Sequence, residues 1–186
     1  MTEISYNAAK STLTGDRIHL YPKVDLAESE VKDVDFTQVN PIAFGTSCSL
    51  EVTAETIDAS NKMGGNWKNT RVGQLGWTIT AEALYSFEED HTSFSKLLAA
   101  YANRDAIGVC LGIVAKTEAE FEQARAAGFK LDADDYVVAK GKAYITACSA
   151  NFGTGGEVVS YSVTLTGDGE LKTGTAPTAD TATTEE

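Results

Sequence analysis

The sequence predicts a mainly β fold in which two β-sheets pack as a sandwich or half-barrel, with one flanking α-helix and a second, inserted helix. Three observations favour this class. Apolar and polar residues alternate along most of the chain, which is the period of a strand. Helical spacing is confined to two short stretches, so strands and helices do not alternate as in a doubly wound fold. Turn residues separate the strand-like runs.

About seven strands are expected, and the first three lie at residues 17–24, 42–57 and 74–86. Pro22 favours an edge position or a strand end for the first, because proline donates no ladder hydrogen bond. The third alternates most clearly: Trp77 and Ile79 share one face, and Thr78 and Thr80 share the other. We therefore expect Trp77 and Ile79 in the core.

Four further strands are expected at residues 106–116, 136–150, 158–166 and 170–172. The run 106–116 is nearly all apolar, which indicates burial on both faces. Residues 152–157 are rich in glycine and form a connecting turn, and residues 167–169 form a tight turn before the last strand.

Two segments have helical spacing. Between His91 and Asn103, apolar residues recur at i, i+3, i+4 and i+7, and we expect all four in the core: Phe94, Leu97, Leu98 and Tyr101. The second helix is expected at residues 117–128, where Thr117 and Glu120 form a capping box and Gly128 ends the helix. Its apolar face is thin, so we interpret it as an insertion lying on the surface.

Length and composition predict one domain over residues 1–173, of which residues 1–16 form an extended N-terminal arm. Residues 174–186 are small, polar or acidic, and we expect a disordered, Thr-rich tail there. The net charge of −12 argues against a surface that grips nucleic acid by neutralising phosphates. No apolar run approaches the roughly 18 residues of a membrane span. The first residues lack a basic stretch followed by an apolar one, so we expect no secretory signal and expect folding in a cytoplasm.

The sequence predicts no catalytic residue, no cofactor and no metal site. It has only two histidines and none of the serine hydrolase, metalloprotease or nucleotide-binding motifs. Three widely spaced cysteines without a CxxC pair indicate neither a disulfide framework nor zinc. The cluster at residues 88–91 (EEDH) is best explained as the acidic start of a helix, with a metal site as the minor alternative. The aspartates at residues 132–135 lack the other ligands of a calcium loop and indicate a solvated turn.

The candidate interaction surface is a polar loop at residues 61–71, in which we single out Asn61, Lys62, Gly65, Trp67, Lys68 and Arg71. An aromatic side chain in a long, basic, glycine-containing loop is typical of a contact surface. The alternative is that Trp67 folds back onto the domain. The loop is locally positive and the rest of the chain is acidic, which suits head-to-tail contact between identical subunits.

A set of short motifs extends from Ile42 to Leu171. The first comprises Gly45, Thr46, Ser47, Leu50, Thr56, Ile57, Asp58, Ser60 and Lys62. The second comprises Gly65, Trp67, Gly73, Trp77, Thr78 and Ile79, and the last comprises Tyr161, Val163, Leu165, Thr166, Gly167, Gly169 and Leu171. In this combination the chain resembles the major tail tube proteins of long-tailed bacteriophages of the siphophage type. The helix expected at residues 117–128 departs from the pattern.

This resemblance implies a structural subunit, similar also to the tube proteins of contractile tails and type VI secretion. Such subunits form rings, usually hexameric, that stack into a tube, and the loop at residues 61–71 would reach the next ring. The implied partners are further copies of the chain and other tail proteins, namely the tape measure, the terminator and the baseplate or tip. DNA would pass through an acidic lumen without being held, with no membrane involved. The implied location is the virion tail, assembled in the host cytoplasm.

A second hypothesis is a β-sandwich virion decoration protein, or a surface- or carbohydrate-binding module. Such a module needs an exposed aromatic platform, for which Trp67 is the candidate. An enzyme with an unrecognised site has the least support, because a site needs convergent polar groups.

Overall fold

The computed structural model describes residues 15–24, 34–42, 45–59, 67–85, 92–115, 117–154, 157–175 and 177–178. The elements, in chain order, are the 3-10 helix η1 (Gly15–Arg17), strands β1 (Ile18–Lys23), β2 (Gly45–Asp58) and β3 (Thr70–Leu84), helix α2 (Phe94–Asn103), strand β4 (Ala106–Ile113), helix α3 (Glu118–Ala126), and strands β5 (Tyr136–Asn151), β6 (Ser160–Gly167) and β7 (Lys172–Thr173). Neither described α-helix is long and apolar enough to cross a bilayer. The strand beginning at Thr70 starts four residues earlier than expected and lengthens the β2–β3 hairpin.

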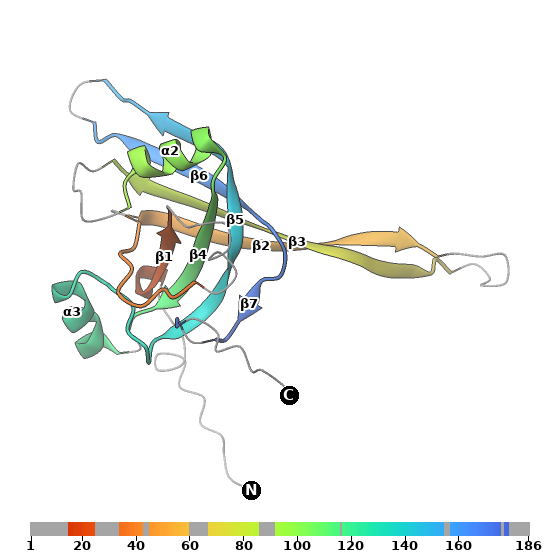
Figure 1. The fold of residues 1–186 in the computed structure, drawn as a ribbon, viewed down its shortest axis with the longest axis horizontal. Helices are drawn as coiled ribbons and strands as arrows, with labels where there is room; N and C mark the ends of the chain where they lie inside the picture. The colour runs from red at the N-terminus through yellow and green to blue at the C-terminus, as the bar shows by residue number, and fades with distance from the viewer. Residues whose placement is uncertain are drawn as a thin grey trace, which may run out of the picture.

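The described strands form one antiparallel sheet in the order β1-β4-β5-β6-β3-β2, with β7 paired to β5. The mainly β class is confirmed, but the described strands form one curled sheet in place of the two packed sheets that the sequence predicts (Figure 1). Where the edges β1 and β2 approach each other, the Ile42 amide donates to the Leu20 carbonyl oxygen at 2.8 Å. Strand twist and the register shifts in three of the strand pairs allow this curl.

The sheet has a core on each side. The larger core lies on the side to which Trp77 and Ile79 point, and we call this side the core face. It gathers buried side chains from β1, β3, β4, β5, β6 and α2, and the partly buried Leu50 of β2 packs against them. The smaller core lies on the opposite side and contains Tyr21, Val34, Phe36, Cys110, Val114, Leu131 and Val137. Successive strand residues point to opposite faces, so the neighbours Leu20 and Tyr21 enter different cores.

Helix α2 packs on the core face through Phe94, Leu97 and Ala100. The expectation of burial is wrong for Leu98 and Tyr101, which are 43% and 44% exposed. Leu98 follows Leu97, the centre of the buried stripe, and is therefore rotated by about 100° away from the sheet. Tyr101 lies in the last turn beside a small hollow that it lines with Tyr144, which leaves part of its ring in water.

Helix α3 lies on the surface, as its sequence predicts. The Thr117 hydroxyl accepts from the Glu120 amide, and the Glu120 carboxylate accepts from the Thr117 amide, which completes the capping box. At the other end, Gly128 has φ +77°, and the amides of Gly128 and Phe129 donate to the carbonyls of Arg125 and Ala124. No residue of α3 is buried. Its shape is therefore set by its caps rather than by packing.

The chain remains in contact with the domain beyond residue 173, where we expected the tail to begin. Pro177 is buried, and its carbonyl oxygen accepts from the Phe36 amide at 2.8 Å. The buried Lys140 ammonium donates to the Thr178 carbonyl oxygen at 2.9 Å. A buried ammonium needs such a partner, which explains why this polar segment is held. Residues 179–186 and 1–14 lie outside the described residues.

Candidate functional site

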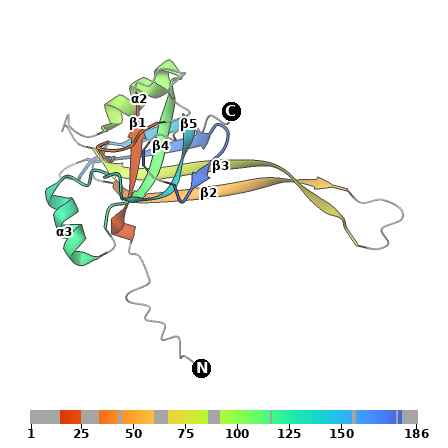
Figure 2. The same ribbon diagram turned by 60° about the horizontal axis from the view of Figure 1, so that its bottom comes forward.

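The β2–β3 hairpin extends far beyond the rest of the sheet (Figures 1 and 2). Strand β6 pairs with β3 only from Thr78 to Leu84, so residues 67–76 have no β6 partner, and residues 51–59 have β3 as their one partner strand. We call these described residues the hairpin arm. The Ala59 amide donates to the Asn69 carbonyl oxygen at 2.8 Å and continues the pairing past both strands.

One side of the hairpin arm is apolar and exposed. Val52 pairs with Trp77, Ala54 with Leu75, and Thr56 with Val72, so these residues share the side that continues the core face. Val52, Val72 and Leu75 are 56%, 70% and 71% exposed. We call Val52, Ala54, Val72 and Leu75 the apolar stripe. A contiguous stripe of this kind on a projecting element is typical of a contact surface.

Trp77 fixes the hairpin arm to the domain. Its indole lies over Gly167, its cross-strand neighbour on β6, and also contacts Gly141 of β5. The indole N–H donates to the Gly169 carbonyl oxygen at 3.1 Å. The two glycines leave a slot in which the Trp77 ring lies buried. Ile79 is buried as well, so the expectation of burial is confirmed for both residues. The root of the hairpin arm is therefore rigidly packed, although the rest of the arm is exposed.

The interaction loop expected at residues 61–71 is shorter than the sequence predicts. Arg71 lies within β3, opposite Ile57, and Asn61, Lys62 and Gly65 fall outside the described residues. Trp67 is 88% exposed, so the alternative that its side chain folds back onto the domain is wrong. The Lys68 ammonium lies 4.0 Å from the Asp58 carboxylate in an exposed ion pair.

The sheet face opposite the core face carries a band of hydroxyl side chains across β2, β3, β6 and β5. These residues are Ser47, Ser49, Thr53, Thr78, Thr80, Thr146, Ser149, Ser160, Ser162, Thr164 and Thr166. The Thr146 hydroxyl lies 3.0 Å from that of Thr166, so the band is partly hydrogen-bonded to itself. We call it the hydroxyl face.

The charges on the hydroxyl face are mainly negative. Strand alternation places Glu51, Glu55 and Glu82 on it. Its cations are Lys142, which pairs with Asp168 at 2.7 Å, and Arg71 on the hairpin arm. Lys140, which is buried, and Lys172 lie on the same side of the sheet beyond the band of hydroxyls, paired across β5 and β7. This face therefore presents hydroxyls and carboxylates with little free positive charge near the domain.

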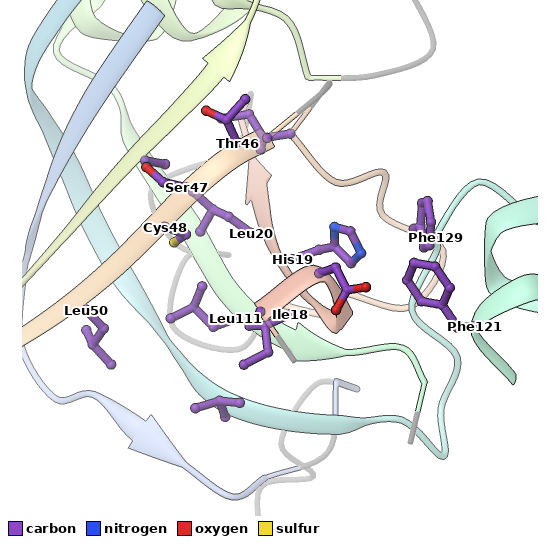
Figure 3. Close-up of a pocket in the computed structure, with 16 residues that line it drawn as sticks. Ile18, His19, Leu20, Thr46, Ser47, Cys48, Leu50, Leu111, Phe121 and Phe129 are labelled. Carbon is purple, nitrogen blue, oxygen red and sulfur yellow. The ribbon is translucent and has the colours of Figure 1, made fainter. Parts of the chain in front are cut away.

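A groove opens on the core side where β1 and β2 approach without pairing (Figure 3). Its volume is about 820 Å³, and most of its lining is apolar, including Ile18, Leu20, Leu50, Ala81, Leu111 and Val138. One end is formed by aromatic rings: His19 lies 4.6 Å from Phe129, and Phe121 of α3 lies 5.5 Å from Phe129, measured between ring centroids. The groove is therefore an extension of the core that remains open to solvent.

Two ionisable side chains in the groove have pKa values shifted from their ordinary values. Burial lowers the pKa of His19, although Asp16 nearby acts in the opposite direction. The Cys48 residue is exposed as a whole, but burial of its thiol raises the pKa to about 11. Neither group has the partner that would activate it for catalysis in the part of the chain described, since the His19 Nε2 atom is buried without a hydrogen bond.

The described residues contain no cluster of three or more metal-ligating side chains. The aspartates near residue 132 form a turn: the Asp132 amide donates to the Asp135 carboxylate, and the Gln38 side chain donates to the Asp132 carboxylate. The acidic cluster at residues 88–91 lies outside the described residues.

Solved structures share this architecture. A chain in the tail of an empty gene transfer agent particle, refined with C6 symmetry, aligns with a TM-score of 0.58 at 14% identity, over 88% of this chain and 100% of its own length. The SPP1 tail tube, from solid-state NMR and cryo-EM, aligns with a TM-score of 0.56 at 15% identity, over 88% and 80%. The chain has the tail tube fold. The cap that terminates the tube of the anti-feeding prophage also aligns, with a TM-score of 0.53 at 16% identity over 92% and 99%.

No family model matches the sequence, and no curated protein matches it. The likeness to the tail tube fold thus lies in backbone geometry. Sequence reasoning located the Trp67 region but missed the hydroxyl face and the groove. The hydroxyl face had a signal, the alternating Thr and Ser of residues 78–80 and 160–166. The groove had none, because distant segments form it.

Proposed function

We propose that this chain is a structural subunit that self-assembles into rings, and that the rings stack to form the tail tube of a phage. The hairpin arm carries this proposal, because an exposed apolar projection with a firmly packed root is typical of a surface that contacts another chain. The tail tube fold supports it, and one of the similar structures is a tail with C6 symmetry. A head-to-tail interface explains open-ended stacking.

Ring closure would satisfy the sheet edges. Both β1 and β2 are edge strands, and β2 is 14 residues long. A long edge strand left unpaired invites uncontrolled association with other chains. We infer hexameric rings, in which neighbouring subunits cover these edges.

The hydroxyl face would line the bore. Carboxylates such as Glu51 and Glu82 repel DNA phosphates, and hydroxyls offer neutral, exchangeable hydrogen bonds. DNA therefore passes without being held. The opposite face is unsuited to this role, because α2 covers it.

The inferred partners are other copies of this chain and the proteins at the two ends of a tail, namely a terminator and a baseplate or tip, together with a tape measure inside the tube. Similar structures include a tube-terminating cap and the baseplate of the anti-feeding prophage, which supports a terminator and a baseplate as partners. The role is structural and not enzymatic. The site of action is the virion tail, after assembly in the host cytoplasm.

Shortening the hairpin tests the stacking role. Residues 60–68 are replaced by Asn-Gly, which suits a two-residue turn, so that the strands up to Ala59 and Asn69 keep their pairing. Electron microscopy of the purified protein should show single rings where the wild type gives tubes. Tubes of normal length from the shortened protein would exclude residues 60–68, with Trp67 and Lys68, from the inter-ring contact, although the apolar stripe is still present in this variant.

Charge reversal tests the bore. Tubes with Glu51→Lys and Glu82→Lys should bind short duplex DNA in a salt-dependent manner, and wild-type tubes should not. The matched control is Glu122→Lys with Asp134→Lys, which makes the same charge change on the exposed α3 and the 132–135 turn. Equal DNA retention by both double variants would contradict the assignment of the hydroxyl face.

The alternative is a virion decoration protein or a carbohydrate-binding module. Such a module presents several aromatic rings together. Among the described residues, the strongly exposed aromatics are Trp67 in the hairpin arm and Phe152 directly after β5. Figure 1 shows the hairpin arm extending away from the end of the sheet where β5 passes into β6. The structure thus gives this alternative less support than the tube.

A further inference from the structure

We propose that the groove between β1 and β2 receives the apolar stripe of the hairpin arm of a second copy, from the adjacent ring. This inference rests on the proposed function and adds the receiving surface to it. It assigns a role to the groove, for which the domain itself has no occupant among the described residues.

The two surfaces match in chemistry. The stripe presents Val52, Val72 and Leu75, which lie in water in the isolated chain. The groove presents Ile18, Leu50 and Leu111 among its aliphatic lining. Removing both surfaces from water together is favourable in proportion to the apolar area buried.

The charges match in sign. Asp16 is the only carboxylate in the groove lining, which contains no lysine or arginine. Helix α3, whose Phe121 lines the groove, carries three glutamates against one arginine. Residues 56–59 and 67–72, at the outer end of the hairpin arm, carry Lys68 and Arg71 against Asp58, which pairs with Lys68 at 4.0 Å, so one positive charge is left over. An arm whose stripe enters the groove therefore brings its positive end toward an acidic rim.

The occupant is a second copy because the hairpin arm cannot reach its own groove. Figures 1 and 2 show the hairpin arm extending away from the domain, whereas the groove lies between β1 and the first half of β2. The strands of the hairpin arm are paired along their length, and Trp77 holds the root in its slot. A contact between two different surfaces of identical chains repeats without closing, as stacking requires.

The test uses Cys48, which lines the groove. Val52, Val72 and Leu75 are replaced one at a time by cysteine, tubes are assembled, and thiols are oxidised at pH 9, since the Cys48 pKa of about 11 slows the reaction at neutral pH. At least one of the three variants should give a ladder of covalent multimers on a non-reducing gel. Cys48→Ser in the same background should abolish that ladder.

The controls separate this inference from the proposed function. Glu51→Cys and Thr53→Cys lie on the other side of the same hairpin arm and should give no ladder above that of the wild type. If the wild type forms tubes but no stripe variant gives a Cys48-dependent ladder, the groove assignment is overturned. The proposed function as a tube subunit is then retained. A wild-type protein that forms neither rings nor tubes overturns the proposed function and this inference with it.

Discussion

Gly167→Ala should destabilise the protein, although an alanine is normally the better strand residue. Gly167 is the last residue of β6, and its φ is not positive, so the glycine is not needed for its backbone angle. The space it leaves is filled by the Trp77 indole, and an added Cβ would overlap three atoms of that ring.

The magnitude follows from two opposing effects. Replacing a glycine by alanine gains about 0.5–1 kcal/mol in a strand interior, which is the upper limit for Gly167 at the end of β6. Forcing a methyl group into a packed core costs about 1–3 kcal/mol, and displacing the indole also weakens its hydrogen bond to Gly169, worth about 0.5–1.5 kcal/mol. The net loss is about 2 kcal/mol, which lowers Tm by about 4–8 °C for a chain of this size.

The assay is urea unfolding followed by far-UV circular dichroism, with Gly76→Ala as the matched control. Gly76 lies in β3, and an added Cβ would meet the Thr53 hydroxyl oxygen at 3.6 Å, an ordinary contact. Gly76→Ala should therefore be neutral or stabilising. If both variants are equally stable, or if Gly167→Ala exceeds the wild type, the Trp77 slot does not have the packing described.

Three further predictions concern the periphery. Thr117→Ala should speed amide exchange in α3, by the loss of a cap worth about 1 kcal/mol, and leave global unfolding unchanged because α3 buries no residue; a lower global stability would contradict this. A chain ending at residue 173 should unfold more easily than one ending at residue 178, because it lacks the carbonyls that meet Phe36 and Lys140; equal urea midpoints would refute the anchoring. The pKa of His19 is lowered on folding, so its contribution to stability is present above its unfolded value near 6.5 and is lost as pH falls; His19→Phe should therefore lose less stability between pH 7 and pH 5 than the wild type.

Local patterns predicted the elements well because their causes are local. The alternation around Trp77 and Ile79 set the inward side of β3, and the pair Thr117 and Glu120 set the start of α3. Leu75 shows the limit of this reasoning. It has the same strand period as Trp77, but β6 pairs with β3 only as far as Thr78, so the core ends before Leu75. Burial there depends on a partner strand some ninety residues away in sequence.

The functional surfaces divide in the same way. The exposed Trp67 belongs to one contiguous segment, and its composition indicated a contact loop. The groove joins residues of β1, β2, β4 and the segment after α3, and no local pattern indicates such a juxtaposition. Leu98 was misplaced for a related reason, since the choice of the buried stripe on α2 depends on how closely Ala100 lets the helix approach the sheet.

Cryo-electron microscopy of the purified protein at high concentration tests the central proposal most directly. The account predicts rings and stacked tubes in which the hydroxyl face, with Glu51 and Glu82, lines the bore and the hairpin arm of each subunit enters the adjacent ring. A protein that stays monomeric up to its solubility limit, or a tube with the hydroxyl face turned outward, would contradict it.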